Sequence, residues 1–206
     1  TQSRSSAASD VYKRQLEILS EATNVIAEGE VLQLMNMHDA SLDEADYLRV
    51  IRSKTAKLFE ASARLGAILA NSPPDVEEAC ATYGQALGTA FQIIDDVLDY
   101  DGDTAEMGKN LGDDLREGKS TLPLIAAMER GTPSQAEIVR QAIEQGSTER
   151  LEEVVSIVRS TGALDVTRAA AFAEAHRAMA AARLLPANAY SEGLLELAAQ
   201  LLGRRN

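Results

Sequence analysis

Apolar residues recur at helical spacing along almost the whole chain, and this period limits the fold more than any other feature of the sequence. One run shows it clearly, with Tyr47, Val50, Ile51, Leu58, Phe59, Leu65 and Leu69 on a period of about 3.6 residues. We find no alternating strand pattern of useful length. The sequence therefore predicts an all-α fold, a single-domain bundle of about eight helices.

Prolines, glycines and capping residues separate the helical runs. The predicted helices span residues 16–37, 41–69, 74–100, 121–130, 132–146, 147–160, 163–185 and 189–202. Ser41 and Glu44 fit a capping box, and Ser147 is the predicted cap of the helix after Gly146. Gly84 and Gly88 lie one turn apart inside a helix, where each costs about 1 kcal/mol relative to Ala. They predict a close approach by a neighbouring helix or a bound ligand.

Charge and cysteine content exclude several classes of function. The chain has 206 residues, 45% of them hydrophobic, and a net charge of −12. Nucleic acids and anionic membranes call for clustered Lys and Arg, so we expect neither partner. The single Cys80 cannot form an internal disulfide, and no apolar run approaches the roughly 20 residues that span a bilayer. We expect a soluble, cytoplasmic protein with no transmembrane segment.

Three aspartates stand in the apolar helical segment of residues 91–101, FQIIDDVLDYD. Asp95 and Asp99 stack on one helix face, Asp96 lies beside them, and Gln92 lies one turn back. Such a cluster near a helix C-terminus is unfavourable, because the carboxylates repel one another and meet the negative end of the helix dipole. A bound Mg2+ reverses this cost, since it prefers oxygen ligands. The alternative is a charged helix end without a ligand.

A glycine-rich loop follows, with glycines at 102, 108, 112 and 118. It carries Lys109 and Lys119 close to the aspartates. Carboxylates for Mg2+ beside ammonium groups for phosphate indicate a site for a diphosphate.

The motifs of this region carry a resemblance to a known family. FQIIDDVLDY followed by GKNLGDDLREGKSTLPL resembles the second aspartate-rich region of the trans-polyprenyl diphosphate synthases, most closely the bacterial long-chain, octaprenyl-type enzymes. Two earlier segments agree with it in the right order, EGEVLQL at 28–34 and SKTAKLFEA at 53–61. The resemblance covers about Gln15 to the C-terminus and implies an isoprenoid-synthase-type helical bundle.

The resemblance implies an activity and a set of site residues. Such enzymes add isopentenyl diphosphate to an allylic diphosphate primer such as farnesyl diphosphate, and octaprenyl-type products supply quinone side chains. Matched by motif position, the Mg2+ ligands are Asp95, Asp96 and Asp99. Asp95 is the expected direct ligand, and Asp96 and Asp99 complete the cluster directly or through waters. The residues that hold the allylic diphosphate are Lys54, Lys109 and Lys119.

Further roles follow from the same motif positions. Thr55 and Gln92 point their oxygen atoms at the nascent cation, and Phe91 lines the substrate region. Lys54, Thr55, Gln92 and Lys109 are thus the implied catalytic residues. The resemblance also implies a homodimer for the full-length form.

The sequence departs from the family pattern at its N-terminal end. The first aspartate-rich motif precedes EGEVLQL in the family and is absent here, so we interpret residues 15–206 as the C-terminal portion of a synthase domain whose N-terminal helices are missing. Residues 1–14, TQSRSSAASDVYKR, do not continue the family pattern and are predicted to be non-native or disordered. Two other functions stay open, a non-catalytic helical subunit of a prenyltransferase and a terpene cyclase-like enzyme.

Several polar residues have two readings. Gln33 serves either a buried hydrogen bond between helices or the substrate region. Asp113, Asp114 and Glu117 either orient Lys109 and Lys119 or are solvated loop charges, with a slight preference for the latter. Solvated positions are predicted for Lys57 and for the pairs Glu77–Glu78 and Glu152–Glu153. His38 and His176 are predicted to be surface or structural residues.

Overall fold

The computed structural model describes residues 2–101 and 112–203, and within these ranges the chain forms helices and no strand. The elements are α1 (Gln2–Met35), α2 (Glu44–Ile51), the π-helix η1 (Arg52–Ala56), α3 (Lys57–Leu69), α4 (Pro74–Asp101), α5 (Asp113–Arg116), α6 (Leu122–Arg130), α7 (Pro133–Gln145), α8 (Leu151–Ser160), α9 (Ala163–Ala182) and α10 (Ala189–Gly203). The predicted all-α class is confirmed.

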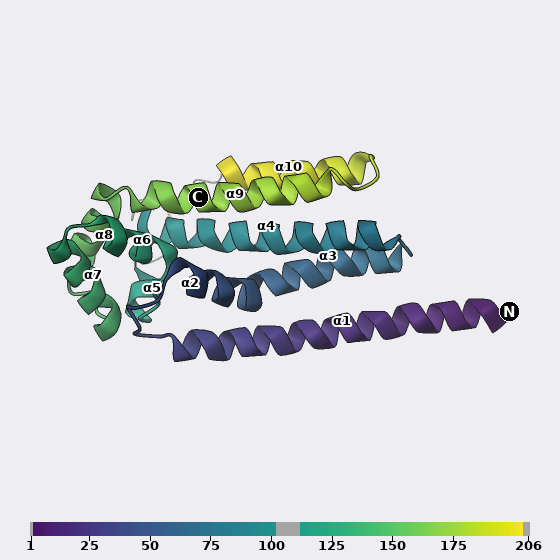
Figure 1. Ribbon diagram of the computed structural model, residues 1–206, viewed down its shortest axis with the longest axis horizontal. Coiled ribbons are helices and arrows are strands. Elements are labelled where there is room, and N and C mark those ends of the chain that lie inside the picture. Colours follow the sequence, from purple (N-terminus) through teal and green to yellow (C-terminus); the bar gives the residue numbers. More distant parts are fainter. Residues whose placement is uncertain (1, 102–111, 204–206) are drawn as a thin grey trace.

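Helix α4 lies in the middle of the bundle (Figure 1). It packs between α3 on one side and α9 on the other, α1 lies beyond α3, and α10 lies against α9. The short helices α5 to α8 gather at the end where α4 stops. Apolar residues of α4 are buried there, among them Val97 and Tyr100, which cluster with Val154 and Val158 of α8. The carboxylate-bearing end of α4 is therefore held in a packed layer.

Two predicted helix starts are wrong, because local hydrogen bonds place the caps elsewhere. Asp43, and not Ser41, caps α2, since its Oδ1 accepts from the Asp46 amide at 2.9 Å while the Ser41 hydroxyl donates to Asp39. Helix α8 begins at Leu151 because Ser147 still belongs to the end of α7, where its amide donates to the Ala142 carbonyl at 3.1 Å.

The predicted helix over 41–69 is also interrupted. It divides into α2, η1 and α3, with the π-helix at Arg52–Ala56. A further short helix, α5, lies in the glycine-rich segment that was predicted to be a loop. These differences raise the number of elements above the predicted eight without changing the class of fold.

The two glycines of α4 mark the close approach of a neighbouring helix, as predicted. A Cβ on Gly84 would lie 2.3 Å from the Phe59 carbonyl oxygen of α3, and a Cβ on Gly88 would lie 2.8 Å from the Ala56 Cα of η1. Gly29 of α1 makes the same kind of contact with η1, because its Cβ would lie 2.7 Å from the Lys54 backbone nitrogen. The π-helix is thus in backbone contact with α1 and α4.

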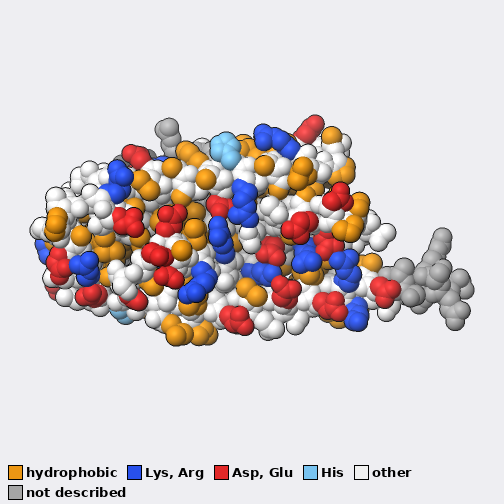
Figure 2. Space-filling view, in the orientation of Figure 1, with side chains coloured by type: hydrophobic (Ala, Val, Ile, Leu, Met, Phe, Trp, Pro, Cys, Tyr) orange, Lys and Arg blue, Asp and Glu red, His pale blue; other side chains and the backbone are white. Residues whose placement is uncertain are grey.

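Helix α1 lies along the edge of the bundle and is helical through residues 2–14 (Figure 1). Arg14 in this segment donates to Glu77 of α4 at 2.7 Å. The non-native origin of residues 1–14 stays a prediction. Helix α1 carries exposed apolar side chains, among them Val31, Leu34 and Met35. Hydrophobic side chains are visible at the lower edge of Figure 2. In the described ranges, no helix is long and apolar enough to cross a membrane.

Candidate functional site

A cavity of about 260 Å³ lies where the C-terminal end of α1, α2, η1, α4 and the segment 114–121 meet. It brings together six of the residues that the sequence singles out, namely Lys54, Thr55, Gln92, Asp95, Asp96 and Lys119. Gln33 also lines it, which favours the substrate-region reading of that residue. The wall therefore combines carboxylates, ammonium groups and uncharged oxygen donors from segments far apart in the chain.

The π-helix presents two of these side chains. A π-turn inserts an extra residue into the helical ladder and is common at functional sites. Here it spans Arg52–Ala56, so Lys54 and Thr55 both line the cavity while Ala56 is fully buried against Gly88. The close contacts from Gly29 and Gly88 leave this bulge little room to relax.

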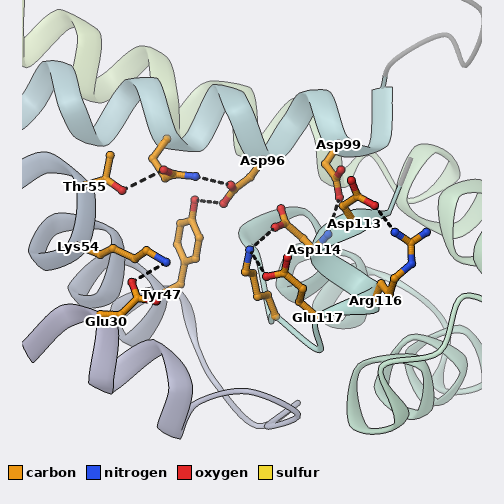
Figure 3. Close-up of polar contacts among 12 residues, drawn as sticks. Glu30, Tyr47, Lys54, Thr55, Asp96, Asp99, Asp113, Asp114, Arg116 and Glu117 are labelled. Atoms are coloured by element: carbon orange, nitrogen blue, oxygen red, sulfur yellow. Dashed lines mark hydrogen bonds and ion pairs between the residues drawn. The ribbon is translucent and has the colours of Figure 1, made fainter. Parts of the chain in front are cut away.

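Four side chains form a hydrogen-bonded chain along the cavity wall (Figure 3). The Thr55 hydroxyl donates to Gln92 Oε1 at 3.0 Å, and Gln92 Nε2 donates to Asp96 Oδ1 at 2.9 Å. The Tyr47 hydroxyl donates to the other carboxylate oxygen, Asp96 Oδ2, at 2.6 Å. Both oxygens of Asp96 are therefore held by uncharged donors.

The carboxylates of this end of α4 are electrostatically unfavourable in the ligand-free protein. Burial raises the pKa of Asp96 to about 8, and the charge of Asp114 adds to this rise. Burial, followed by the charge of Asp114, also raises the pKa of Asp99 to about 6. A cation placed among these groups would relieve the cost.

The two lysines of the cavity are held by carboxylates before any ligand binds. Lys54 Nζ lies 2.8 Å from Glu30, and Lys119 Nζ lies 2.9 Å from Asp114 and 2.8 Å from Glu117. Burial lowers the pKa of Lys119, but the pairs with Glu117 and Asp114 outweigh it and raise the pKa overall. The slight preference for a solvated charge is wrong for Asp114, which is largely buried and pairs with Lys119, whereas Glu117 pairs with Lys119 but stays exposed.

The α4 C-terminus is neutralised from outside the cavity. Arg159 of α8 donates to the Tyr100 carbonyl oxygen at 3.3 and 3.2 Å from Nε and Nη2, and Arg168 of α9 pairs with Asp101. Positive charge at a helix C-terminus is favourable, because it offsets the negative end of the helix dipole. These arginines therefore stabilise the end of the helix without entering the site.

Three predicted site residues lie elsewhere or cannot be placed. Phe91 packs against Phe59, with ring centroids 5.8 Å apart, and is not part of the cavity wall. Asp99 is also outside the wall and accepts from the Asp114 amide at 3.3 Å. Lys109 lies outside the described residues. The roles assigned to these residues stay predictions.

Sequence reasoning missed several polar groups of the site. The helical period predicts Tyr47 only as an apolar core position. A buried tyrosine needs a partner for its hydroxyl, and Tyr47 lies two turns before Lys54. Asn36, Ser120 and Thr121 also line the cavity. Elsewhere, Lys57 is not solvated but pairs with Glu21 and Glu60 at 2.8 Å each.

The oxygen donors fit a hard divalent cation. Within the described ranges, no three His, Cys, Asp or Glu side chains are close enough to enclose a metal ion by themselves. That is compatible with Mg2+, which keeps several waters and uses one or two carboxylates together with substrate phosphates. Asp95 and Asp96 lie on the cavity wall together with Asp114.

Comparison with known proteins identifies the family. The sequence pattern of the family described as Polyprenyl synthetase matches residues 3–159, so the chain belongs to this family. It is 54% identical over 184 residues to the octaprenyl diphosphate synthase of Escherichia coli K12, covering 89% of this chain and 57% of that protein. It is 44% identical over 189 residues to the all-trans-nonaprenyl-diphosphate synthase (geranyl-diphosphate specific) of Rhodobacter capsulatus, covering 92% and 58%.

The fold agrees with this membership. The crystal structure of a polyprenyl synthase from Caulobacter crescentus CB15, complexed with calcium and isoprenyl diphosphate, superposes with a TM-score of 0.87 at 46% identity. The match covers 94% of this chain and 60% of that one. The chain thus spans somewhat more than half the length of the relatives it matches.

Proposed function

We propose that this chain carries the second aspartate-rich site of a long-chain trans-polyprenyl diphosphate synthase. The reaction adds isopentenyl diphosphate to an allylic diphosphate such as farnesyl diphosphate, and an octaprenyl-type product would supply a quinone side chain. One observation carries the proposal: Asp95 and Asp96 face the same cavity as Lys54 and Lys119. The names of the relatives support the same reaction class.

The difficult step is the departure of pyrophosphate from the allylic carbon. As the carbon–oxygen bond breaks, both bonding electrons stay on the leaving oxygen, and Lys54 and Lys119 neutralise this charge. Their carboxylate partners, Glu30 and Asp114, hold them at the cavity until phosphate oxygens replace those contacts. By its motif position, Lys109 is proposed to have the same role.

Asp95, with Asp96 and Asp99, would hold Mg2+, which supplies further Lewis-acid neutralisation of the diphosphate when bound. The allylic cation that remains is attacked by the double bond of isopentenyl diphosphate, and loss of a proton regenerates an allylic diphosphate. Thr55 and Gln92 place their oxygen atoms near that positive carbon. Phe91 contributes to the substrate region, and the full-length protein acts as a homodimer.

The direct test is incorporation of labelled isopentenyl diphosphate into a farnesyl diphosphate primer, with products separated by length. For the full-length protein we expect Mg2+-dependent incorporation that falls at least about 10²-fold in Asp95→Ala, because one electrostatic partner of the leaving group is lost. Asp113→Ala is the matched control, since this aspartate lies on α5 and pairs with Arg116.

Each outcome decides between the functions left open. Incorporation lost only in Asp95→Ala supports the synthase. A cyclised hydrocarbon product would instead identify a terpene cyclase. Absence of both products, together with absence of Mg2+-dependent pyrophosphate binding in calorimetry, would contradict the proposal and favour a non-catalytic subunit.

A further inference from the structure

The hydrogen-bonded chain from Tyr47 to Thr55 has a fixed direction. Gln92 Nε2 donates to Asp96 Oδ1, so the NH2 group of the Gln92 amide faces Asp96. The amide oxygen then faces the other way, toward Thr55, and the single proton of the Thr55 hydroxyl is used in donating to it. The groups left over at this end are oxygen lone pairs of Gln92 and Thr55. Both residues line the cavity.

Tyr47 controls the end of this chain that lies away from Thr55. Tyr47 and Asp96 are each only 4% exposed, so neither can replace its partner by bulk water. The Tyr47 hydroxyl occupies Asp96 Oδ2 and leaves Oδ1 for Gln92. The Tyr47 hydroxyl therefore fixes the orientation of the carboxylate, so that Oδ1 points at Gln92.

The backbone restricts the two ends of this arrangement. Tyr47 is buried on α2, while Thr55 sits in the π-turn that touches Gly29 of α1 and Gly88 of α4. Gln92 and Asp96 are one turn apart on α4. The side chains that link these three elements therefore have few alternative partners.

We infer that Tyr47 is a positioning residue that acts through Asp96 and Gln92, so that Gln92 and Thr55 present oxygen lone pairs, and no N–H or O–H, to the positive carbon of an allylic substrate. This inference rests on the proposed function. It assigns Tyr47 a part in selecting for positive charge at one end of the cavity. A tyrosine that only fills space would affect charged and neutral ligands alike.

The experiment compares two allylic diphosphate analogues of the same shape. One carries a tertiary ammonium nitrogen at the position of the cationic carbon, and the other a neutral carbon. Calorimetric titration of the full chain in Mg2+ gives the ratio of their dissociation constants. Because both analogues share the diphosphate, this ratio cancels any change in metal or phosphate binding.

Tyr47→Phe is expected to weaken the ammonium analogue about tenfold and the neutral analogue less than about twofold, the size expected for one oriented hydrogen bond. In turnover, kcat falls by a similar factor while the KM of the allylic substrate stays within about twofold. Tyr83→Phe is the matched control. Tyr83 is 3% exposed on the same helix as Asp96, and its hydroxyl donates to the Leu194 carbonyl at 2.9 Å, outside the cavity wall. This variant is expected to leave the ratio unchanged.

Two further variants complete the test. Thr55→Val removes the hydroxyl lone pairs and sets the full size of the effect. Asp96→Leu removes the acceptor that orients the Gln92 amide, so it is expected to lower the ratio even if Tyr47→Phe does not fold. Equal losses for both analogues in Tyr47→Phe, or an unchanged ratio in Asp96→Leu, would overturn the inference while leaving the synthase intact. A wild-type chain that binds neither analogue would overturn the proposed function and this inference with it.

Discussion

The two ends of helix α4 each bury a carboxylate, and they treat it in opposite ways. Near the N-terminus, Glu77 is 7% exposed and accepts hydrogen bonds from Arg14 at 2.9 and 2.7 Å and from Arg64 at 2.9 Å. Near the C-terminus, Asp96 is 4% exposed, and its partners are the uncharged side chains of Tyr47 and Gln92. One end has two cations for its carboxylate, and the other has further carboxylates beside it.

The pKa values follow from this difference. Burial acts to raise the pKa of Glu77, but the bonds from Arg64 and Arg14 outweigh it and lower the pKa overall. At the other end burial and Asp114 raise the pKa of Asp96 to about 8. The helix dipole adds to the contrast, because it favours negative charge at the N-terminus and opposes it at the C-terminus. Charge is balanced where α4 joins α1 and α3, and unbalanced where a cation is expected to bind.

Ligand binding should stabilise the protein only through the site at the C-terminal end of α4. In excess Mg2+, inorganic pyrophosphate at about 100 times its dissociation constant is expected to add about 2.7 kcal/mol, or roughly 5–10 °C in melting temperature. Differential scanning calorimetry measures this shift. Glu77→Gln should keep it, and Asp95→Ala should lose most of it. A shift that survives in Asp95→Ala would place the ligand elsewhere.

Removing the charge of Glu77 should destabilise the packing at the N-terminal end of α4. Glu77→Gln leaves Arg14 and Arg64 without a charged partner and is expected to lower the free energy of unfolding by about 2 kcal/mol, as measured by urea denaturation at pH 7. The two arginines are partly exposed, which limits the loss. Asp95→Asn is the matched change at the other end and should cost less than about 0.5 kcal/mol. Equal losses in the two variants would remove the proposed contrast.

The smallest expected effect concerns pH. The pKa of Asp99 is raised to about 6, so between about 4 and 6 the folded state binds more protons than the unfolded state, and stability falls as pH rises through this window. The lowered pKa of Glu77 acts in the opposite sense, since its stabilisation is present above the unfolded pKa and is lost as pH falls through the folded value.

Asp99→Asn isolates the first of these effects. After allowance for the solvent exposure of Asp99, the variant should remove on the order of 1 kcal/mol of the decline between pH 4 and 6 in Mg2+-free buffer. Thermal melts across this range measure the difference from wild type. If melting temperature depends on pH in the same way for both proteins, the ionised form of Asp99 is not destabilised in the folded state.

Much of the candidate site could be predicted from local spacing. Asp95, Asp96 and Gln92 share a helix face because residues three and four apart are neighbours on a helix, and the spacing alone shows it. The close approach to Gly84 and Gly88 also follows from sequence, since two glycines one turn apart in a helix interior imply a tight contact. The motif around Lys54 gave its place in the site but not the π-turn that presents it.

The errors concern residues whose partners are distant in the chain. Glu77 was predicted to be solvated, yet its partner Arg14 is 63 positions away. Lys57 was predicted to be solvated, yet it pairs with Glu21, 36 positions away. Tyr47 was read as core, and its hydroxyl partner Asp96 is 49 positions away. No local period contains such pairings.

The sequence by itself determined the helices, their apolar faces and the carboxylate cluster of residues 95–99, because each depends on contacts within a few turns of one helix. The tertiary structure decided which charges are neutralised. Among the described residues it brought two arginines to Glu77 and none to Asp96. It also packed η1 against Gly29 and Gly88, with Lys54 and Thr55 on the same cavity wall as the aspartates. The physical reason is that the pKa of a buried charge depends on what the whole fold packs around it, and packing partners are not ordered by sequence distance.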